Sequence, residues 1–163
     1  MQARPAVWLI FLSAIFRGPA IQAQTLHLSS VHASPGVEVS INLSLAWRRG
    51  HETPSALQWN ITIPAPKTRL MEGSPGPQAQ TAGKGLACRE QSRTAATQTF
   101  TCLLYGGREP IRSGGIGVFR LQIAPGAPPG PARIRIDQAI AVRKDATKVG
   151  MKPTEAVVQI RRK

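Results

Sequence analysis

The sequence has few acidic residues, few aromatic residues and only two cysteines. It carries 8 Asp and Glu against 21 Lys and Arg, and aromatic residues make up 5% of its 163 positions. Proteins that bind nucleic acids usually combine basic charge with aromatic stacking platforms or a recognition helix. Here the basic residues are spread along the chain and no helix of useful length is predicted. We therefore expect no nucleic-acid partner.

The sequence also lacks an apolar run of the roughly 20 residues that a membrane-spanning helix needs. A shorter run, Ala6–Phe16, follows Arg4 and leads to small residues at Ala20 and Ala23. A basic start, a short apolar core and a small-residue exit are typical of a secretory signal peptide. We predict a signal peptide over residues 1–23 and a mature domain over residues 24–163, with an uncleaved membrane anchor as the alternative. The protein is then secreted, extracellular or periplasmic.

Charge remains strongly positive in the predicted mature domain. Arg4 and Arg17 are 2 of the 21 basic residues, so 19 remain against 8 acidic residues, a net charge of +11. Such a charge suits anionic partners such as acidic polysaccharides, lipid headgroups or cell-wall polymers, and it also simply keeps a protein soluble.

The two cysteines, Cys88 and Cys102, form an even pair in a chain that is predicted to be exported. This favours a disulfide, which in the chain-entropy model stabilises a loop of about 15 residues by about 3 kcal/mol. No histidine stands at a zinc-ligand spacing from either cysteine, and neither is flanked as a catalytic nucleophile would be. We predict a Cys88–Cys102 disulfide.

Residues that could carry catalysis or bind a metal are scattered singly. The acidic residues form no pair of the kind that glycosidases use, and the three histidines show no metal-ligand spacing. The sequence contains no Gly-x-Ser-x-Gly, no phosphate loop and no dinucleotide fingerprint. We therefore predict no catalytic residues, no metal site and no cofactor, and we expect the protein not to be an enzyme.

Alternation of apolar and polar residues dominates the rest of the sequence. In Val37–Leu45 the five odd-numbered positions are apolar and point one way. Gly114–Val142 repeats the pattern on both sides of the Pro-Gly segment Ala124–Ala132: Phe119, Leu121, Ile123, Ile134 and Ile136 are expected to be buried. A period of two is typical of strands with one buried face and one face exposed to solvent.

Further strands are expected at Thr25–Val31, Ala56–Ile63, Gly85–Arg89, Thr99–Tyr105 and Thr154–Arg161. Trp59 is expected in the core, with a sugar-stacking platform as the alternative. Lys67–Lys84 is rich in Gly, Pro, Ala and Gln, so we predict a long exposed loop with at most a turn or one short strand. The chain is therefore predicted to be all-β, an antiparallel sandwich of about eight to nine strands with Greek-key or jelly-roll connections.

The order of these parts resembles that of the cohesin domain, a bacterial module of the dockerin-binding and carbohydrate-binding superfamily. Four stretches carry the resemblance: Val31–Ala46, Ser55–Ala65, Gly114–Val142 and the closing TEAVVQIR. It spans Thr25–Arg161, as a single copy. The resemblance departs at Ile63-Pro64-Ala65, where the family has a Tyr-Asp-Pro turn, and the cysteine pair is not a usual family feature.

The resemblance implies a non-catalytic binding module that presents a sheet face to a protein partner of dockerin type or to a polysaccharide. No recognition residue of the family matches this sequence one to one. We name as candidates the polar residues on the central strands, Arg120, Gln122, Arg133 and Arg135. The alternative function is a structural component of the cell envelope or of an extracellular or secretion assembly. The sequence does not predict an oligomeric state.

Overall fold

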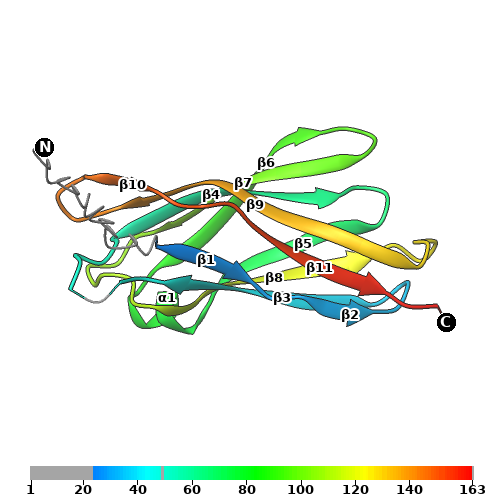
Figure 1. The fold of residues 1–163 in the computed structure, drawn as a ribbon, viewed down its shortest axis with the longest axis horizontal. Helices are drawn as coiled ribbons and strands as arrows, with labels where there is room; N and C mark the ends of the chain where they lie inside the picture. Colours follow the sequence, from blue (N-terminus) through cyan, green and yellow to red (C-terminus); the bar gives the residue numbers. More distant parts are fainter. Residues whose placement is uncertain (1–23, 49, 163) are drawn as a thin grey trace, which may run out of the picture.

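The computed structural model describes residues 24–48 and 50–162, and the predicted signal peptide lies outside these residues. Two β-sheets lie face to face along the length of the domain (Figure 1). The elements in chain order are β1 (Thr25–Leu28), β2 (Val31–Ala33), β3 (Glu38–Ala46), β4 (Ala56–Pro64), β5 (Thr68–Pro75), α1 (Pro77–Thr81), β6 (Gly85–Arg93), β7 (Thr97–Tyr105), β8 (Gly114–Ile123), β9 (Gly130–Val142), β10 (Lys148–Gly150) and β11 (Thr154–Ile160). No helix among the described residues is long and apolar enough to cross a membrane.

The small sheet has the strand order β1-β3-β8-β5, and the large sheet has the order β2-β11-β9-β4-β7-β6, with β10 paired to β9. From β3 to β6, and again from β7 to β9, successive strands alternate between the two sheets, as Greek-key and jelly-roll sandwiches require. The predicted all-β sandwich is confirmed. Its strands pair antiparallel except for β2 and β11, which run parallel.

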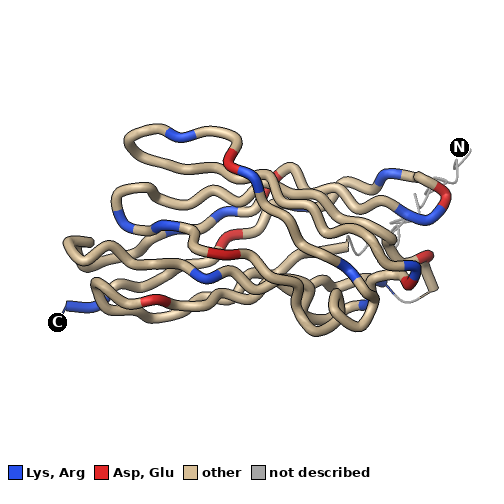
Figure 2. The backbone as a smooth tube through the Cα atoms, turned by 180° about the vertical axis from the view of Figure 1, so that it is seen from behind, with Lys and Arg blue, Asp and Glu red and all other residues tan. Residues whose placement is uncertain are grey.

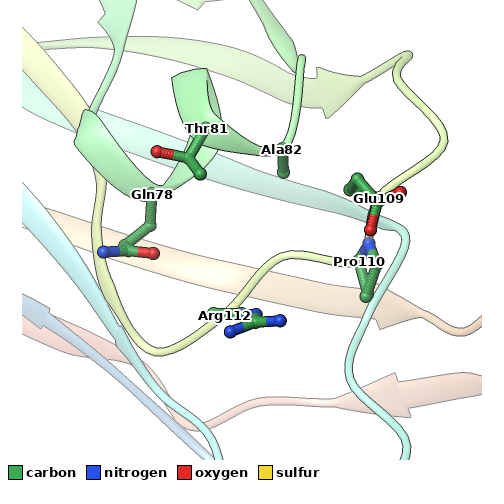
Figure 3. A pocket seen from close by; sticks show the side chains of 6 residues that line it. All are labelled: Gln78, Thr81, Ala82, Glu109, Pro110 and Arg112. Carbon is green, nitrogen blue, oxygen red and sulfur yellow. The ribbon is translucent and has the colours of Figure 1, made fainter.

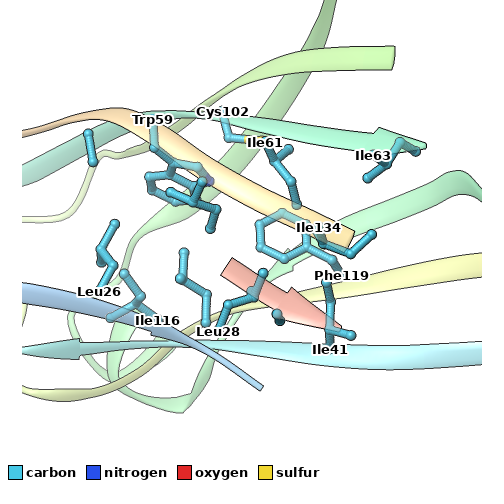
Figure 4. Packing of buried hydrophobic residues seen from close by; sticks show 14 of the residues in the cluster. Leu26, Leu28, Ile41, Trp59, Ile61, Ile63, Cys102, Ile116, Phe119 and Ile134 are labelled. Carbon is cyan, nitrogen blue, oxygen red and sulfur yellow. The ribbon is translucent and has the colours of Figure 1, made fainter. Parts of the chain in front are cut away.

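The core fills the space between the sheets and follows the predicted alternation. Phe119, Leu121, Ile123, Ile134 and Ile136 are all fully buried, as expected from the sequence. Trp59 of β4 and Phe119 of β8 meet edge to face, with ring centroids 6.4 Å apart, and so join the large sheet to the small one (Figure 4). Such an aromatic pair adds about 1 kcal/mol to the burial of its surface.

Val37 departs from the predicted pattern. It is 41% exposed, although the alternation placed it with the buried residues of its strand. The strand β3 begins only at Glu38, and Val37 belongs to the turn before it, where its N–H donates to the carbonyl of Ser34.

The segment Lys67–Lys84 is not the long loop that its composition predicted. It contains the eight-residue strand β5 and the short helix α1. Alternation is hidden in β5 because a register shift between Leu70 and Glu72 leaves Met71 as an extra residue. Glycine and proline near its end further weaken the pattern that predicts a strand.

The described residues form 11 strands, not the eight or nine that the sequence predicted. The first predicted strand ends at Leu28, and β2 then pairs in the other sheet, so that one expected strand becomes two. A third small strand, β10, lies in the predicted polar connection Arg143–Pro153. The hairpin β6–β7 is also longer than predicted, because Glu90–Arg93 continue the ladder that was expected to end at Arg89.

The predicted disulfide is present. Cys88 on β6 lies directly opposite Cys102 on β7, with Cα atoms 4.0 Å apart and an S–S bond between them. Cys102 is fully buried, so the bond ties the edge of the large sheet to the core.

Candidate functional site

The outer face of β9, β4, β7 and β6, here called the large-sheet face, carries a continuous row of hydrogen-bonded side chains. Asn60 Nδ2 donates to Gln138 Oε1 at 3.0 Å, and Thr101 Oγ1 donates to Asn60 Oδ1 at 2.8 Å. Thr101 Oγ1 also lies 3.1 Å from Gln91 Oε1. One row therefore links all four strands and holds its side chains in fixed positions, with Asn60 buried beneath its neighbours.

A β-bulge in β9 places the first member of this row. The register of β4 against β9 shifts between Gln58 and Asn60, and Gln138 has a φ of +48°. A non-glycine residue in this left-handed region costs about 1 kcal/mol. The bulge directs both Asp137 and Gln138 toward the outer face, so it brings Gln138 within reach of Asn60.

A second polar row lies beside the first. The hydroxyls of Thr62 and Thr99 are 3.0 Å apart across β4 and β7. On β9, Arg135 Nε lies 3.2 Å from Asp137 Oδ2. Arg135 is thus paired, whereas Arg89, which lies opposite Thr101 on β6, is in none of the ion pairs found among the described residues.

Apolar side chains lie exposed where β7 approaches its end. Leu103 is 40% exposed and Tyr105 is 48% exposed, both on the outer side of the strand. The Tyr105 ring lies over Gly85 of the edge strand, since a Cβ at Gly85 would lie 3.6 Å from that ring. Leu103 stands beside Gln58 on β4 and Ala87 on β6. This part of the face therefore exposes apolar side chains to solvent.

A hollow of about 310 Å³ opens near the polar row and is lined by Arg89, Glu90, Gln91 and Thr101. Hydrogen bonds from Arg93 and then from Gln98 lower the pKa of Glu90 to about 2. Glu90 is therefore an anion at neutral pH that is held by its own hairpin.

A second hollow, of about 270 Å³, lies between α1 and the segment 106–113 (Figure 3). Gln78, Thr81 and Ala82 line it from the helix side, and Glu109, Pro110 and Arg112 line it from the loop. Nearby, Lys84 is buried and its Nζ donates to the carbonyls of Gly106 and Gly107. Burial lowers the pKa of Lys84, and the Glu109 carboxylate opposes that shift.

The four residues predicted from the sequence do not share one face. Arg120 and Gln122 lie on β8 of the small sheet, where Arg120 pairs with Glu72 at 3.1 Å. Arg133 and Arg135 lie on β9 of the large sheet. The segment between Ile123 and Gly130 carries the chain from one sheet to the other, so consecutive alternating strands expose their polar residues on opposite sides of the sandwich.

Sequence reasoning did not single out Leu103 and Tyr105. The segment Thr99–Tyr105 has apolar residues at inward-facing and at outward-facing positions. Phe100, Cys102 and Leu104 face inward, and Leu103 and Tyr105 face outward. Apolar residues at the outward-facing positions were the signal in the sequence that could have identified this part of the face. Trp59, by contrast, is fully buried and cannot serve as the sugar-stacking platform considered from the sequence.

Over residues 24–48 and 50–162, no group of three or more His, Cys, Asp or Glu side chains is arranged to hold a metal ion. What the large-sheet face offers is a rigid polar surface with an exposed apolar end. Such a surface suits recognition of another molecule by contact.

No protein-family model matches the sequence, and no curated protein matches it. Solved structures do match in fold. A chain from a type I cohesin–dockerin complex of Clostridium thermocellum aligns with a TM-score of 0.67 and 14% identity, over 85% of this chain and 99% of that one. The cohesin module of a family 33 glycoside hydrolase from Clostridium perfringens aligns with a TM-score of 0.66 and 10% identity, over 86% and 98%.

A non-cellulosomal cohesin from the archaeon Archaeoglobus fulgidus also aligns, with a TM-score of 0.60 and 8% identity, over 85% of this chain and 91% of that chain. These neighbours come from bacteria and an archaeon, and the alignment spans nearly all of each of them. The chain described here has the β-sandwich fold of cohesin modules.

Proposed function

We propose that this chain is a non-catalytic module that binds a protein partner on the large-sheet face. The fold supports the proposal, because it is the fold of cohesins, one of which is named in a complex with a dockerin. A partner of dockerin type is the first expectation. The predicted signal peptide would place the module outside the cytoplasm.

The observation that carries the proposal is the exposure of Leu103 and Tyr105 beside a pre-ordered polar row. Protein interfaces typically have an apolar or aromatic centre with polar groups around it, and Tyr is enriched among the residues that dominate binding energy. The row Gln138–Asn60–Thr101–Gln91 is already hydrogen-bonded, so little side-chain entropy is lost when a partner covers it.

Of the residues named from the sequence, Arg133 and Arg135 belong to this proposal. They lie on β9 at the border of the large-sheet face, where charges influence association rate and specificity more than affinity. Arg120 and Gln122 lie on the opposite side of the sandwich and have no role in this docking surface.

A polysaccharide partner is a less favoured version of the same role. Among the described aromatic residues, Tyr105 is the exposed one, and the sandwich presents no row of aromatic rings for a sugar chain. A single Tyr can contribute one stacking contact at most.

A structural role in the envelope or in an extracellular assembly is favoured by one observation. The strand β6 stands at the end of the large sheet, and in the described part of the chain its ladder partner is β7 alone. An edge strand of nine residues can pair with a strand of another subunit. Light scattering at high concentration tests this role: a strict monomer would count against it.

The docking proposal is tested by immobilising the sandwich, residues 24–163, and applying a panel of dockerin modules, the exported proteins of the native host and a set of insoluble glycans. We expect a protein to be retained and to be displaced by free sandwich. Retention by glycans alone, or no retention of any kind, would contradict a protein-binding role.

A further inference from the structure

Three loops meet at one end of the sandwich and are joined by hydrogen bonds. The Trp47 N–H donates to Ser113 Oγ at 2.8 Å, which links the segment of residues 47–48 and 50–55 to segment 106–113. The Ile111 N–H donates to the Pro54 carbonyl at 2.8 Å, and the Ser55 N–H donates to the Val142 carbonyl at 2.7 Å, just before segment 143–147. We call these three segments together the loop end. Positions far apart in the sequence are fixed side by side there.

The loop end is basic. Among its described residues the cations are Arg48, Arg108, Arg112, Arg143 and Lys144, with Lys148 directly after it, and the anions are Glu52, Glu109 and Asp145. The three ion pairs among the described residues lie elsewhere in the sandwich, at Arg93, Arg120 and Arg135. The Asp145 carboxylate instead accepts a hydrogen bond from the Thr147 N–H at 2.9 Å. Figure 2 shows basic positions, with acidic ones among them, at the end of the sandwich that lies away from the label C.

The opposite end of the sandwich also has basic residues. The first strand of the domain, β1, begins at the loop end. Thr25, the first residue of β1, pairs with Ala46, which directly precedes Trp47 (Figure 1). In the sequence, only Arg17–Ala23 separates Gln24 from the apolar run Ala6–Phe16. A segment of that length spans at most about 25 Å. An apolar run held in a membrane, during export or afterwards, therefore keeps the loop end close to the lipid headgroups.

From the convergence of the loops, the excess of cations over anions among their described residues and the point where the chain enters, we infer that the loop end binds an anionic phospholipid surface. Each Lys or Arg near an anionic bilayer strengthens binding about fivefold, and the effect acts within a Debye length of about 10 Å. The binding is electrostatic and peripheral. It uses charged side chains of the loops, whereas the proposed docking surface uses the apolar end of the large-sheet face, which adjoins the loop end where Tyr105 meets Gly106.

The test uses residues 24–163, because the described residues bury a complete core without the apolar run and the run itself would partition into lipid. Binding is measured by co-sedimentation with vesicles of phosphatidylcholine alone and with vesicles that also contain phosphatidylglycerol. One variant removes an exposed cation from each loop: Arg48→Gln, Arg108→Gln and Lys144→Gln. The matched control removes three exposed cations away from the loop end: Arg69→Gln, Arg133→Gln and Arg161→Gln. Thermal unfolding confirms that both variants fold.

We expect the wild type to bind only the vesicles with phosphatidylglycerol, and less as salt rises. The loop-end variant should lose about 100-fold in partition coefficient, since three cations at about fivefold each are removed, and the control should stay within about fivefold. Equal losses in the two variants would show that total charge matters and not the loop end. No binding to anionic vesicles, or binding to soluble heparin without binding to vesicles, would also overturn the inference.

Discussion

Gly107 lies where a side chain has no room. Its φ is +60°, and a Cβ there would collide with the Ala82 carbonyl oxygen and lie 2.8 Å from the Gly83 carbonyl oxygen. Both obstacles are backbone atoms of the α1–β6 connection, so neither can rotate away. The contact holds segment 106–113 against the turn that follows α1.

We predict that Gly107→Ala lowers the free energy of unfolding by about 2 to 4 kcal/mol, from backbone strain and overpacking together. The control is Gly126→Ala, because a Cβ at Gly126 meets nothing within 4 Å. Chemical denaturation of both variants measures the difference. Equal stability of the two would contradict the close approach at Gly107.

Glu90 makes stability depend on pH in the acid range. Its carboxylate accepts hydrogen bonds from Arg93 Nε at 2.9 Å and from Gln98 Nε2 at 2.7 Å. These bonds lower the pKa of Glu90 from 4.5 to about 2 in the folded protein. The stability that Glu90 contributes is therefore present above pH 4.5 and is lost as the pH falls toward 2.

Glu90→Gln should accordingly melt below the wild type at pH 7, and the gap between their melting temperatures should close near pH 2. Thermal unfolding across this range measures the gap. Exposed Glu38→Gln, on the other sheet, serves as the control for the loss of one negative charge. A gap that stays constant with pH would show that the carboxylate does not retain its charge through these hydrogen bonds.

At the scale of elements, the hairpin β6–β7 depends on its disulfide. The strand β6 has the large sheet on one side only, and most of its residues are exposed. Cys88 and Cys102 connect it covalently to β7 at a separation of 14 residues. We predict that replacing both by Ala lowers the free energy of unfolding by about 3 kcal/mol, chiefly through the unfolded chain.

The measurement is denaturant unfolding with and without a reductant. The wild type should lose the same amount when it is reduced, and the double variant should not respond to the reductant. A wild type that is indifferent to reduction would contradict this role of the bond.

Elements with strict alternation could be predicted from the sequence, and the others could not. Strand β3, the second half of β8 and the part of β9 before its bulge bury every second residue, so their apolar residues locate them. In β5 the extra residue Met71 interrupts the alternation of inward-facing and outward-facing side chains in the middle of the strand. In the tip of the β6–β7 hairpin both faces are exposed, so the residues Glu90–Arg93 show no alternation of apolar and polar side chains. An alternating pattern reports burial on one side, so it fails where an extra residue interrupts the alternation, as in β5, and where neither side is buried, as in the hairpin tip.

At the scale of the whole molecule, alternation tells which residues face outward but not which sheet they belong to. Arg120 and Arg133 look equivalent in the sequence, yet β8 and β9 lie in different sheets. Pairing between distant strands decides the sheet, and that information lies in the packing of the whole core. This is why the fold could be predicted while a single docking face could not.

The two outer faces offer a matched comparison. The large-sheet face exposes Leu103 and Tyr105, whereas Met71 of β5 and Val37, in the turn that leads into β3, are exposed on the side of the small sheet, by 45% and 41%. The four residues are exposed to similar fractions, from 40% to 48%. Replacing either pair by Asp changes the charge of the protein by the same amount, so any difference in binding reports the face and not the charge.

The most direct test of the account is the affinity of a retained protein partner for these two double variants, measured by biolayer interferometry after both are shown to be folded. The account predicts that Leu103→Asp with Tyr105→Asp weakens binding by about 100-fold or more, as the loss of two central contacts typically does. Val37→Asp with Met71→Asp should change it by less than about threefold. Loss of binding in the small-sheet variant, with the large-sheet variant unaffected, would contradict docking on the large-sheet face.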